Sequence, residues 1–152
     1  MEKRDNHDIY SCRCLVINPE GKILLLKKNA SASWNAGKWG FPGGKRETHE
    51  SFSETCLREL QKETGVIVAQ NSFSREFCKS TRAIRDGKYA GKLHTVSFTL
   101  LEIREDEEIV LSEEHSDYKW ASLDDLMLDS AVIQEDRDAS IILHSFMMPS
   151  RH

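Results

Sequence analysis

The chain has 152 residues, of which 39% are hydrophobic and 30% charged, and its formal net charge is -4 with a pI near 5.9. This length favours one compact domain over residues 1–152, large enough to bury a core without disulfides. The composition is that of a soluble globular protein, which argues against membrane and disordered classes. Because the net charge is negative, no overall positive field would attract a nucleic-acid polymer.

The N-terminal stretch MEKRDNHDIY is charged and no apolar run follows it, so neither a signal peptide nor a membrane span is predicted there. The cytoplasm is therefore the expected location. The cysteines do not show the paired C-x2-C spacing of zinc sites; they are Cys12, Cys14, Cys56 and Cys78. We expect reduced thiols, mostly packed in the interior, rather than a disulfide framework.

The first part of the chain predicts a hairpin, a loop and a helix. Residues 10–17 alternate and then become apolar, and residues 22–28 read as a second strand after a turn. The small and polar residues of 29–39 predict a surface loop. Residues 50–65 carry apolar side chains at helical spacing, and Gly65 is typical of a helix C-terminus.

The second part predicts mostly strands, followed by helices. Strands are expected at 65–69, 74–84, 92–103 and 118–121, with an acidic connection at 104–117. Ser122 is a good N-cap for a short helix over 122–129. An amphipathic helix over 134–147 is expected to turn four apolar side chains inward, namely Ile141, Ile142, Leu143 and Phe146. The elements together predict a mixed α+β domain.

Glutamates gather on one face of the helix predicted at 50–65. At about 100° per residue, Glu59 and Glu63 lie about 40° apart and one turn apart, so their carboxylates face the same way. Before the helix, Gly43 and Gly44 allow the backbone to turn tightly and to offer its carbonyls and amides to a ligand. Oxygen ligands of this kind suit Mg²⁺ shared with substrate phosphates. On spacing alone, a solvated helix face with charge pairs stays an alternative.

The string from residue 44 to residue 66 is more specific. Gly44, five residues, Glu50, seven residues and then RELQKETGV resemble the Nudix box, G-x5-E-x7-R-E-U-x-E-E-x-G-U, in which U is bulky and apolar. WGFPG before it and YKWASLDDL later also stand where many Nudix proteins have similar segments. The resemblance implies the Nudix fold, a mixed β-sheet core sandwiched between α-helices. It also implies metal-assisted attack of water on a diphosphate linkage in a nucleoside diphosphate derivative.

The same resemblance implies roles for residues around the box. Gly43 would offer its carbonyl to Mg²⁺, or to Mn²⁺ in its place, and Glu59 and Glu63 would bind the metal or position the attacking water. Glu50 and Arg58 would brace the loop against the helix. Glu114 is the candidate for a further metal ligand, since Nudix enzymes often draw a carboxylate from a loop after the box.

One position departs from the pattern, because Lys62 stands where the box has the first glutamate of its E-E pair, commonly a metal ligand. Three outcomes stay open. Hydrolysis persists with fewer metals or weaker metal binding; Lys62 itself contacts substrate phosphate; or Lys62 extends into solvent and leaves a site with little activity.

Several residues are candidates for substrate contacts by position. The cations that could meet phosphate are Lys45, Arg46, Lys62 and Lys119, although exposed charges of this kind are often only solvated. Trp34 is a candidate for stacking on a base. By contrast, Trp39 and Phe41 read as core anchors, and His49 and His115 as loop residues.

The expected activity is that of a pyrophosphohydrolase acting on a nucleoside triphosphate or a related nucleotide. A nucleotide sugar, a dinucleoside polyphosphate or a dinucleotide cofactor stays open as substrate. The alternative is a nucleotide-binding or regulatory module that has lost hydrolysis through Lys62. In either case the expected partner is a small nucleotide, with no nucleic-acid polymer and no membrane, and dimerisation stays open.

Overall fold

The structure is a computed structural model and describes residues 8–68 and 73–147. Its strands are β1 (Ile9–Ile17), β2 (Ile23–Lys28), β3 (Trp39–Gly40), β4 (Gly43–Lys45), β5 (Phe73–Ala83), β6 (Leu93–Glu102) and β7 (His115–Ala121). Its helices are α1 (Phe52–Thr64), α2 (Leu123–Leu128) and α3 (Gln134–Met147). The hairpin, the helix before Gly65 and the two C-terminal helices are thus confirmed within a few residues.

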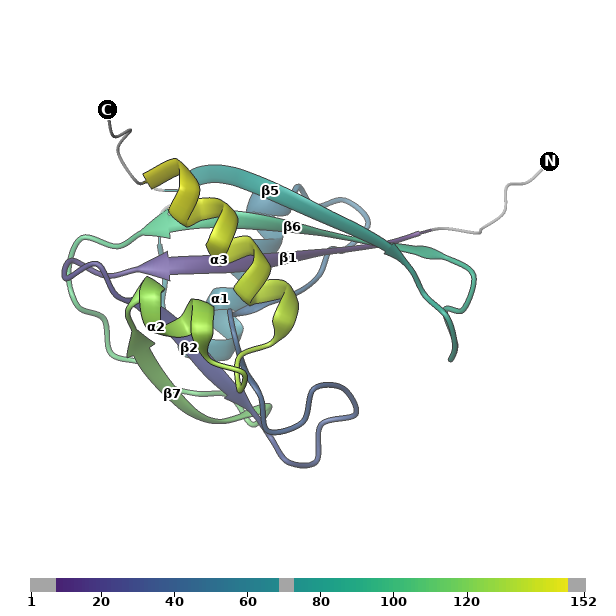
Figure 1. Cartoon of the computed structure of the whole chain (residues 1–152), viewed down its shortest axis with the longest axis horizontal. Coiled ribbons are helices and arrows are strands. Elements are labelled where there is room, and N and C mark those ends of the chain that lie inside the picture. The colour runs from purple at the N-terminus through teal and green to yellow at the C-terminus, as the bar shows by residue number, and fades with distance from the viewer. Residues whose placement is uncertain (1–7, 69–72, 148–152) are drawn as a thin grey trace.

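The described strands form one mixed sheet around β1 (Figure 1). On one side, β1 pairs in parallel with β6, which continues to β5. On the other side, its N-terminal half pairs with β4 and its end, at Ile17, pairs with Ile23 of β2. β2 then carries β3 and β7. The sheet therefore forks where β4 and β2 leave β1.

Helices cover both faces of the sheet, which confirms the predicted α+β sandwich (Figure 1). Alternating residues of β1 explain the two layers. Cys12, Cys14 and Val16 pack with Leu60 of α1 in one cluster. On the opposite face, Leu15 packs with residues of α2 and α3 in the other cluster, among them Leu126, Ala139 and Leu143. Within the described residues, no helix combines the length and apolar character needed to cross a bilayer.

The α1 helix begins and ends with clear signals. The Ser51 hydroxyl accepts the Glu54 N–H, and the Glu54 carboxylate accepts the Ser51 N–H, which is a capping box. Gly65 ends the helix in the left-handed region at φ 77°, where a side chain would be strained. Because both ends are fixed, the residues between them are held in one rotational position relative to β4.

Two predictions about secondary structure and packing are wrong. Residues 65–68 form no strand, and residue 69 lies outside the described range; Val66 packs in the core beside α1 while Ile67 is 72% exposed. In α3, Leu143 is buried as expected, whereas Ile141, Ile142 and Phe146 are exposed. The helix instead turns Asp136, Ala139 and Ser140 inward, because Asp136 has a partner in β1.

The prediction of reduced cysteines is also wrong for one pair, because Cys12 of β1 and Cys56 of α1 form a disulfide. Sequence spacing could not reveal it, since 44 residues separate the two and only the packing of α1 on β1 brings them together. Cys14 and Cys78 are free thiols, as predicted.

Reduction of this disulfide is expected to destabilise the protein. Closing a loop of 44 residues removes conformational entropy from the unfolded chain, which corresponds to about 3–4 kcal/mol. Urea unfolding with and without a thiol reductant measures the effect, and the Cys56→Ser variant should match the reduced protein. Cys78→Ser is the control and should still lose stability on reduction. Equal midpoints with and without reductant would contradict the prediction.

Candidate active site

The two facing glutamates of α1 lie against β4 and are both buried. The Gly43 N–H donates to Glu63 Oε1 at 3.1 Å. Gly44 leaves room for the other carboxylate, since a Cβ at this position would lie 2.5 Å from Glu59 Cδ. The glycine is therefore needed for a close approach, and any side chain there would displace Glu59.

Gly43 and Gly44 lie in a strand rather than in the tight turn that we expected. The Cys14 N–H donates to the Pro42 carbonyl and the Arg46 N–H to the Tyr10 carbonyl, both at 2.7 Å. Gly43 lies between these bonded positions, so its N–H and carbonyl point away from β1 and toward α1. Its carbonyl thus points away from β1, on the side where the Gly43 N–H meets the Glu63 carboxylate.

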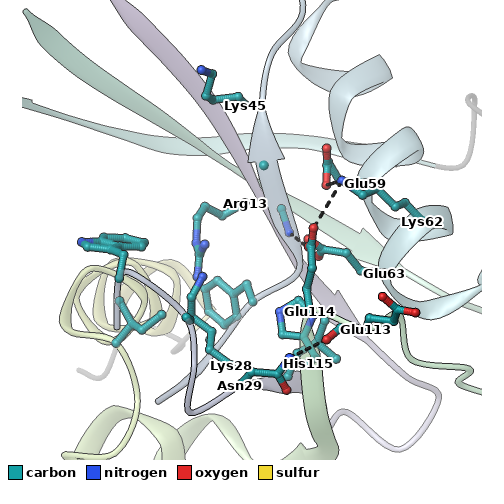
Figure 2. Close-up of a pocket in the computed structure, with 18 of the residues that line it drawn as sticks. Arg13, Lys28, Asn29, Lys45, Glu59, Lys62, Glu63, Glu113, Glu114 and His115 are labelled. Carbon is teal, nitrogen blue, oxygen red and sulfur yellow. Dashed lines mark hydrogen bonds and ion pairs between the residues drawn. The ribbon is translucent and has the colours of Figure 1, made fainter. Parts of the chain in front are cut away.

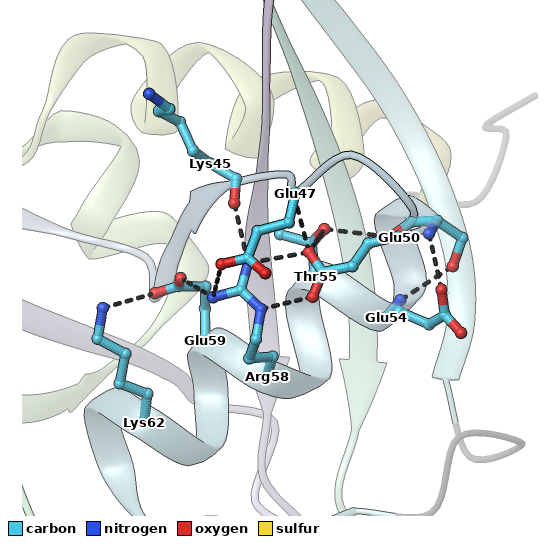
Figure 3. Close-up of polar contacts among 9 residues, drawn as sticks. Lys45, Glu47, Glu50, Glu54, Thr55, Arg58, Glu59 and Lys62 are labelled. Carbon is cyan, nitrogen blue, oxygen red and sulfur yellow. Dashed lines mark hydrogen bonds and ion pairs between the residues drawn. The ribbon is translucent and has the colours of Figure 1, made fainter.

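Arg58 joins the helix to the strand and loop before it (Figure 3). Its guanidinium donates to Glu50 at 2.5 and 2.9 Å, to Glu59 Oε2 at 2.7 Å and to the Lys45 carbonyl at 3.0 Å. Thr55 also donates to Glu50 Oε1 at 2.8 Å. The hydrogen bonds from Arg58 lower the pKa of Glu50 to about 2. Glu50 therefore acts on the site through Arg58 and does not line the cleft itself.

Lys62 lies beside the carboxylates rather than away from them (Figure 2). Its Nζ is 3.9 Å from Glu59 Oε1 and 3.6 Å from Glu114 Oε2. The lysine thus bridges α1 and the segment before β7. Because about half of its side chain is exposed, each of these ion pairs is weak on its own.

A group of possible ligand atoms lies next to Lys62. One ligand atom each from Glu63, Glu114 and His115 lies within 4.8 Å of the other two. Burial raises the pKa of Glu63 well above the usual carboxyl range; the Gly43 N–H opposes this shift, and Glu59 and Glu114 add to it. Burial also lowers the pKa of His115, which favours its neutral form. Burial and neighbouring carboxylates thus disfavour the ionised form of Glu63, and a divalent cation bound beside it would stabilise that form.

Sequence reasoning missed His115 and the pair of Arg13 and Asp136. His115 was read as a loop residue, although it follows Glu114 directly at the start of β7. Arg13 donates to Asp136 at 3.0 and 2.5 Å, and Asp136 also accepts the Phe41 N–H at 2.9 Å. The available signal for Arg13 was a charge inside an apolar strand. Its partner, 123 residues away, had no sequence signal.

The elements enclose a cleft of about 790 Å³ at the fork of the sheet (Figure 2). Its acidic side holds Glu59, Glu63 and Glu114, and its lining cations are Arg13, Lys28, Lys45, Arg46, Arg58 and Lys62. Trp34 also lines it, with Lys28 Nζ 5.4 Å from the ring centroid. Lys119 is not brought there: it lies over the Trp39 ring at 4.4 Å and is paired with Asp129. The predicted phosphate contact of Lys119 therefore has no support in the geometry.

The donor set of this cleft fits a divalent cation. Carboxylate oxygens of Glu63 in α1 and of Glu114 before β7 lie close together, and hard cations such as Mg²⁺ prefer oxygen ligands. Cations on the opposite side could meet the charges of a phosphate chain. The arrangement suits the cleavage of a phosphoanhydride.

Comparison with known proteins agrees with this geometry. The sequence model of the NUDIX domain matches residues 9–141. A bis(5'-nucleosyl)-tetraphosphatase [asymmetrical] of Rattus norvegicus is 37% identical over 115 residues, which cover 72% of this chain and 70% of the relative. A CTP pyrophosphohydrolase of Escherichia coli is 43% identical over 51 residues, 34% of this chain and 37% of the relative. The crystal structure of a MutT protein from Methanosarcina mazei superposes with a TM-score of 0.79 at 24% identity, covering 96% of this chain and 100% of that one. The chain belongs to the Nudix family.

Proposed function

We propose that the protein is a divalent-metal-dependent hydrolase of a diphosphate linkage in a nucleoside polyphosphate. The observation that carries this proposal is the meeting of Glu59, Glu63 and Glu114 on one side of a cleft that has Arg13 and Lys28 across from them. The NUDIX domain model matches residues 9–141. We propose that residues 1–152 act as one domain. Mg²⁺ is the expected ion, with Mn²⁺ as a substitute.

The residues divide the work as follows. The Gly43 carbonyl, Glu59, Glu63 and Glu114 would hold the metal, which when bound would offset charge on the phosphates. Glu59 and Glu63 also orient the attacking water, whose oxygen bonds to phosphorus while its proton passes to a carboxylate. The bridging P–O bond breaks and the leaving phosphate keeps its electron pair. Preorganised charges of this kind supply much of the rate of such reactions.

The remaining cleft residues would bind the rest of the substrate. Lys45 and Arg46 line the cleft as well, although Lys45 Nζ lies by Tyr89 and Arg46 lies over Tyr10, so each would have to turn toward a chain of phosphates. Trp34 lines the outer part of the cleft and is accessible to a base. The relatives that match over most of the chain are named bis(5'-nucleosyl)-tetraphosphatases, so dinucleoside tetraphosphates stand first among the substrates to test, with nucleoside triphosphates second.

Lys62 favours a second candidate, a nucleotide-binding module with lost or weak hydrolysis. Its ammonium group lies near Glu59 and Glu114, where it competes with a metal for their charge. In this function the fold and the cationic side of the cleft would bind nucleotide without turnover. Metal-dependent turnover distinguishes the two functions.

Lys62→Glu is expected to strengthen metal binding and raise hydrolysis. The substitution changes the local charge by two and frees Glu59 and Glu114, so we expect at least about a tenfold gain in Mg²⁺ affinity. Titration calorimetry measures the affinity. Phosphate and pyrophosphate release from dinucleoside tetraphosphates, nucleoside triphosphates and nucleotide sugars measures turnover.

Lys62→Gln is the matched control, because it removes the positive charge without adding a ligand. Turnover by the unchanged protein supports the hydrolase. If the unchanged protein binds nucleotide without turnover and Lys62→Glu hydrolyses it, the binding module is correct. If neither protein hydrolyses any substrate with Mg²⁺ or Mn²⁺, the proposed activity is wrong.

A further inference from the structure

The start of β7 brings a nitrogen atom to the carboxylates of the cleft. His115 and Glu114 both lie with Glu63 in the group whose ligand atoms fall within 4.8 Å of one another (Figure 2). The group joins α1, which carries Glu63, to the start of β7, which carries His115 and pairs with β2. His115 also lines the cleft, so its ring is accessible to an ion bound there.

The His115 ring has an unsatisfied atom. Its Nδ1 is buried and has no hydrogen-bond partner among the described residues. Buried polar atoms nearly always have a partner, so one without it needs an explanation, and an ion is among the usual ones. A neutral imidazole always offers one nitrogen lone pair to a metal.

The backbone that carries the two donors is held in place. The Asn29 N–H donates to the Glu114 carbonyl at 3.3 Å, and the Asn29 side-chain amide donates to the Glu113 carbonyl. The Ser112 hydroxyl accepts the Glu114 N–H at 3.3 Å. Metal ligands depend on this kind of support, because an ordered backbone limits the cost of bringing ligands together.

Lys62 makes Glu59 a less favourable ligand for a cation. Its Nζ lies 3.9 Å from Glu59, which is also bonded to Arg58 at 2.7 Å. Glu59 thus already has two cationic neighbours. The same Nζ lies 3.6 Å from Glu114 Oε2, so an ion bound by Glu114 displaces this half-exposed and weak ion pair. Glu63, Glu114 and His115 are the group whose ligand atoms lie within 4.8 Å of one another, which favours an ion at the start of β7.

We propose that His115 is a nitrogen ligand of the divalent metal, in a centre with Glu63 and Glu114 at the start of β7. This inference rests on the proposed function, since it concerns the metal of the same cleft. It predicts a metal preference as well. Mg²⁺ favours oxygen ligands only, whereas transition ions accept imidazole, so Mn²⁺ should bind this centre more tightly than Mg²⁺.

Pulsed electron paramagnetic resonance of the Mn²⁺-loaded protein tests the nitrogen ligand directly. The unchanged protein should show hyperfine coupling to a directly bound ¹⁴N, which changes on labelling its histidines with ¹⁵N. The coupling should disappear in His115→Gln, and Mn²⁺ affinity should fall at least about tenfold. His144→Gln, a substitution in α3 near Asp124, is the control and should keep both.

Each outcome decides the inference. Bound Mn²⁺ without nitrogen coupling, or coupling that survives in His115→Gln, overturns it. If His115→Gln does not fold, each of the other five histidines is replaced by Gln in turn. A nitrogen coupling that survives in all five variants then assigns His115 as the ligand. The proposed function fails separately, through an absence of metal-dependent hydrolysis. A protein that hydrolyses substrate with Mn²⁺ but shows no nitrogen coupling refutes only the ligand.

Discussion

Glu63→Gln is expected to lower kcat at least about 100-fold, because the variant keeps the shape of the side chain but removes the charge that holds the metal. The Gly43 N–H can still donate to the amide oxygen, so the local fold should remain. Steady-state kinetics with saturating Mg²⁺ measures kcat. Glu102→Gln, on the exposed end of β6, is the matched control and should leave kcat unchanged.

The same variant should be more stable than the unchanged protein when metal is absent. The pKa of Glu63 is raised by folding, so the folded state holds its proton more tightly than the unfolded state. Stability of the unchanged metal-free protein therefore falls as the pH rises from the usual carboxyl range through the raised pKa. Glu63→Gln removes this fall and should gain about 1 kcal/mol at alkaline pH. Urea unfolding across pH, with metal chelated, measures it; lower stability of the variant at every pH would contradict the argument.

Arg58→Ala is expected to have the second large effect, on stability and activity together. It removes the guanidinium that donates to Glu50, Glu59 and the Lys45 carbonyl. Since about a third of the Arg58 side chain is exposed, we expect a loss of about 2 kcal/mol. We also expect at least about a tenfold loss in kcat/KM, since Glu59 is no longer held. Arg58→Lys should restore little, because an ammonium group cannot make the forked contact.

The acid dependence of stability checks the same contact independently. The pKa of Glu50 is lowered to about 2, so its stabilising effect is present above the usual carboxyl pKa and is lost as the pH falls through about 2. The unchanged protein should therefore lose stability between about pH 4.5 and pH 2 more steeply than Arg58→Ala. Unfolding midpoints over this range measure the difference, and parallel pH profiles would refute it.

Local signals predicted much of the fold. The hairpin of β1 and β2, the α1 helix and its end at Gly65 follow from side-chain period and capping residues, which act within a few positions. The family resemblance predicted the sandwich, which period alone did not name. The facing of Glu59 and Glu63 followed from helix geometry, and the structure places both beside β4.

The contacts that the sequence did not predict join residues that lie far apart in the chain. The inward face of α3 could not be read from its apolar residues, because Asp136 turns inward toward Arg13. The pairing of Cys12 with Cys56 and the approach of His115 to Glu63 likewise require the tertiary arrangement. Local pattern carries no information on which residue a distant side chain meets, so such contacts appear only in the folded chain.

The central position of β1 bears on how the chain is made. Of the strands that the structure describes it is the first to be synthesised, yet its parallel neighbour begins at Leu93 and the partner of Arg13 is Asp136. Until those residues emerge, the nascent strand has one open edge and an unpaired charge. Contacts this far apart in sequence form slowly and leave apolar surface exposed meanwhile. We expect the cleft to assemble only after release of the last helix, with the newborn chain dependent on chaperones until then.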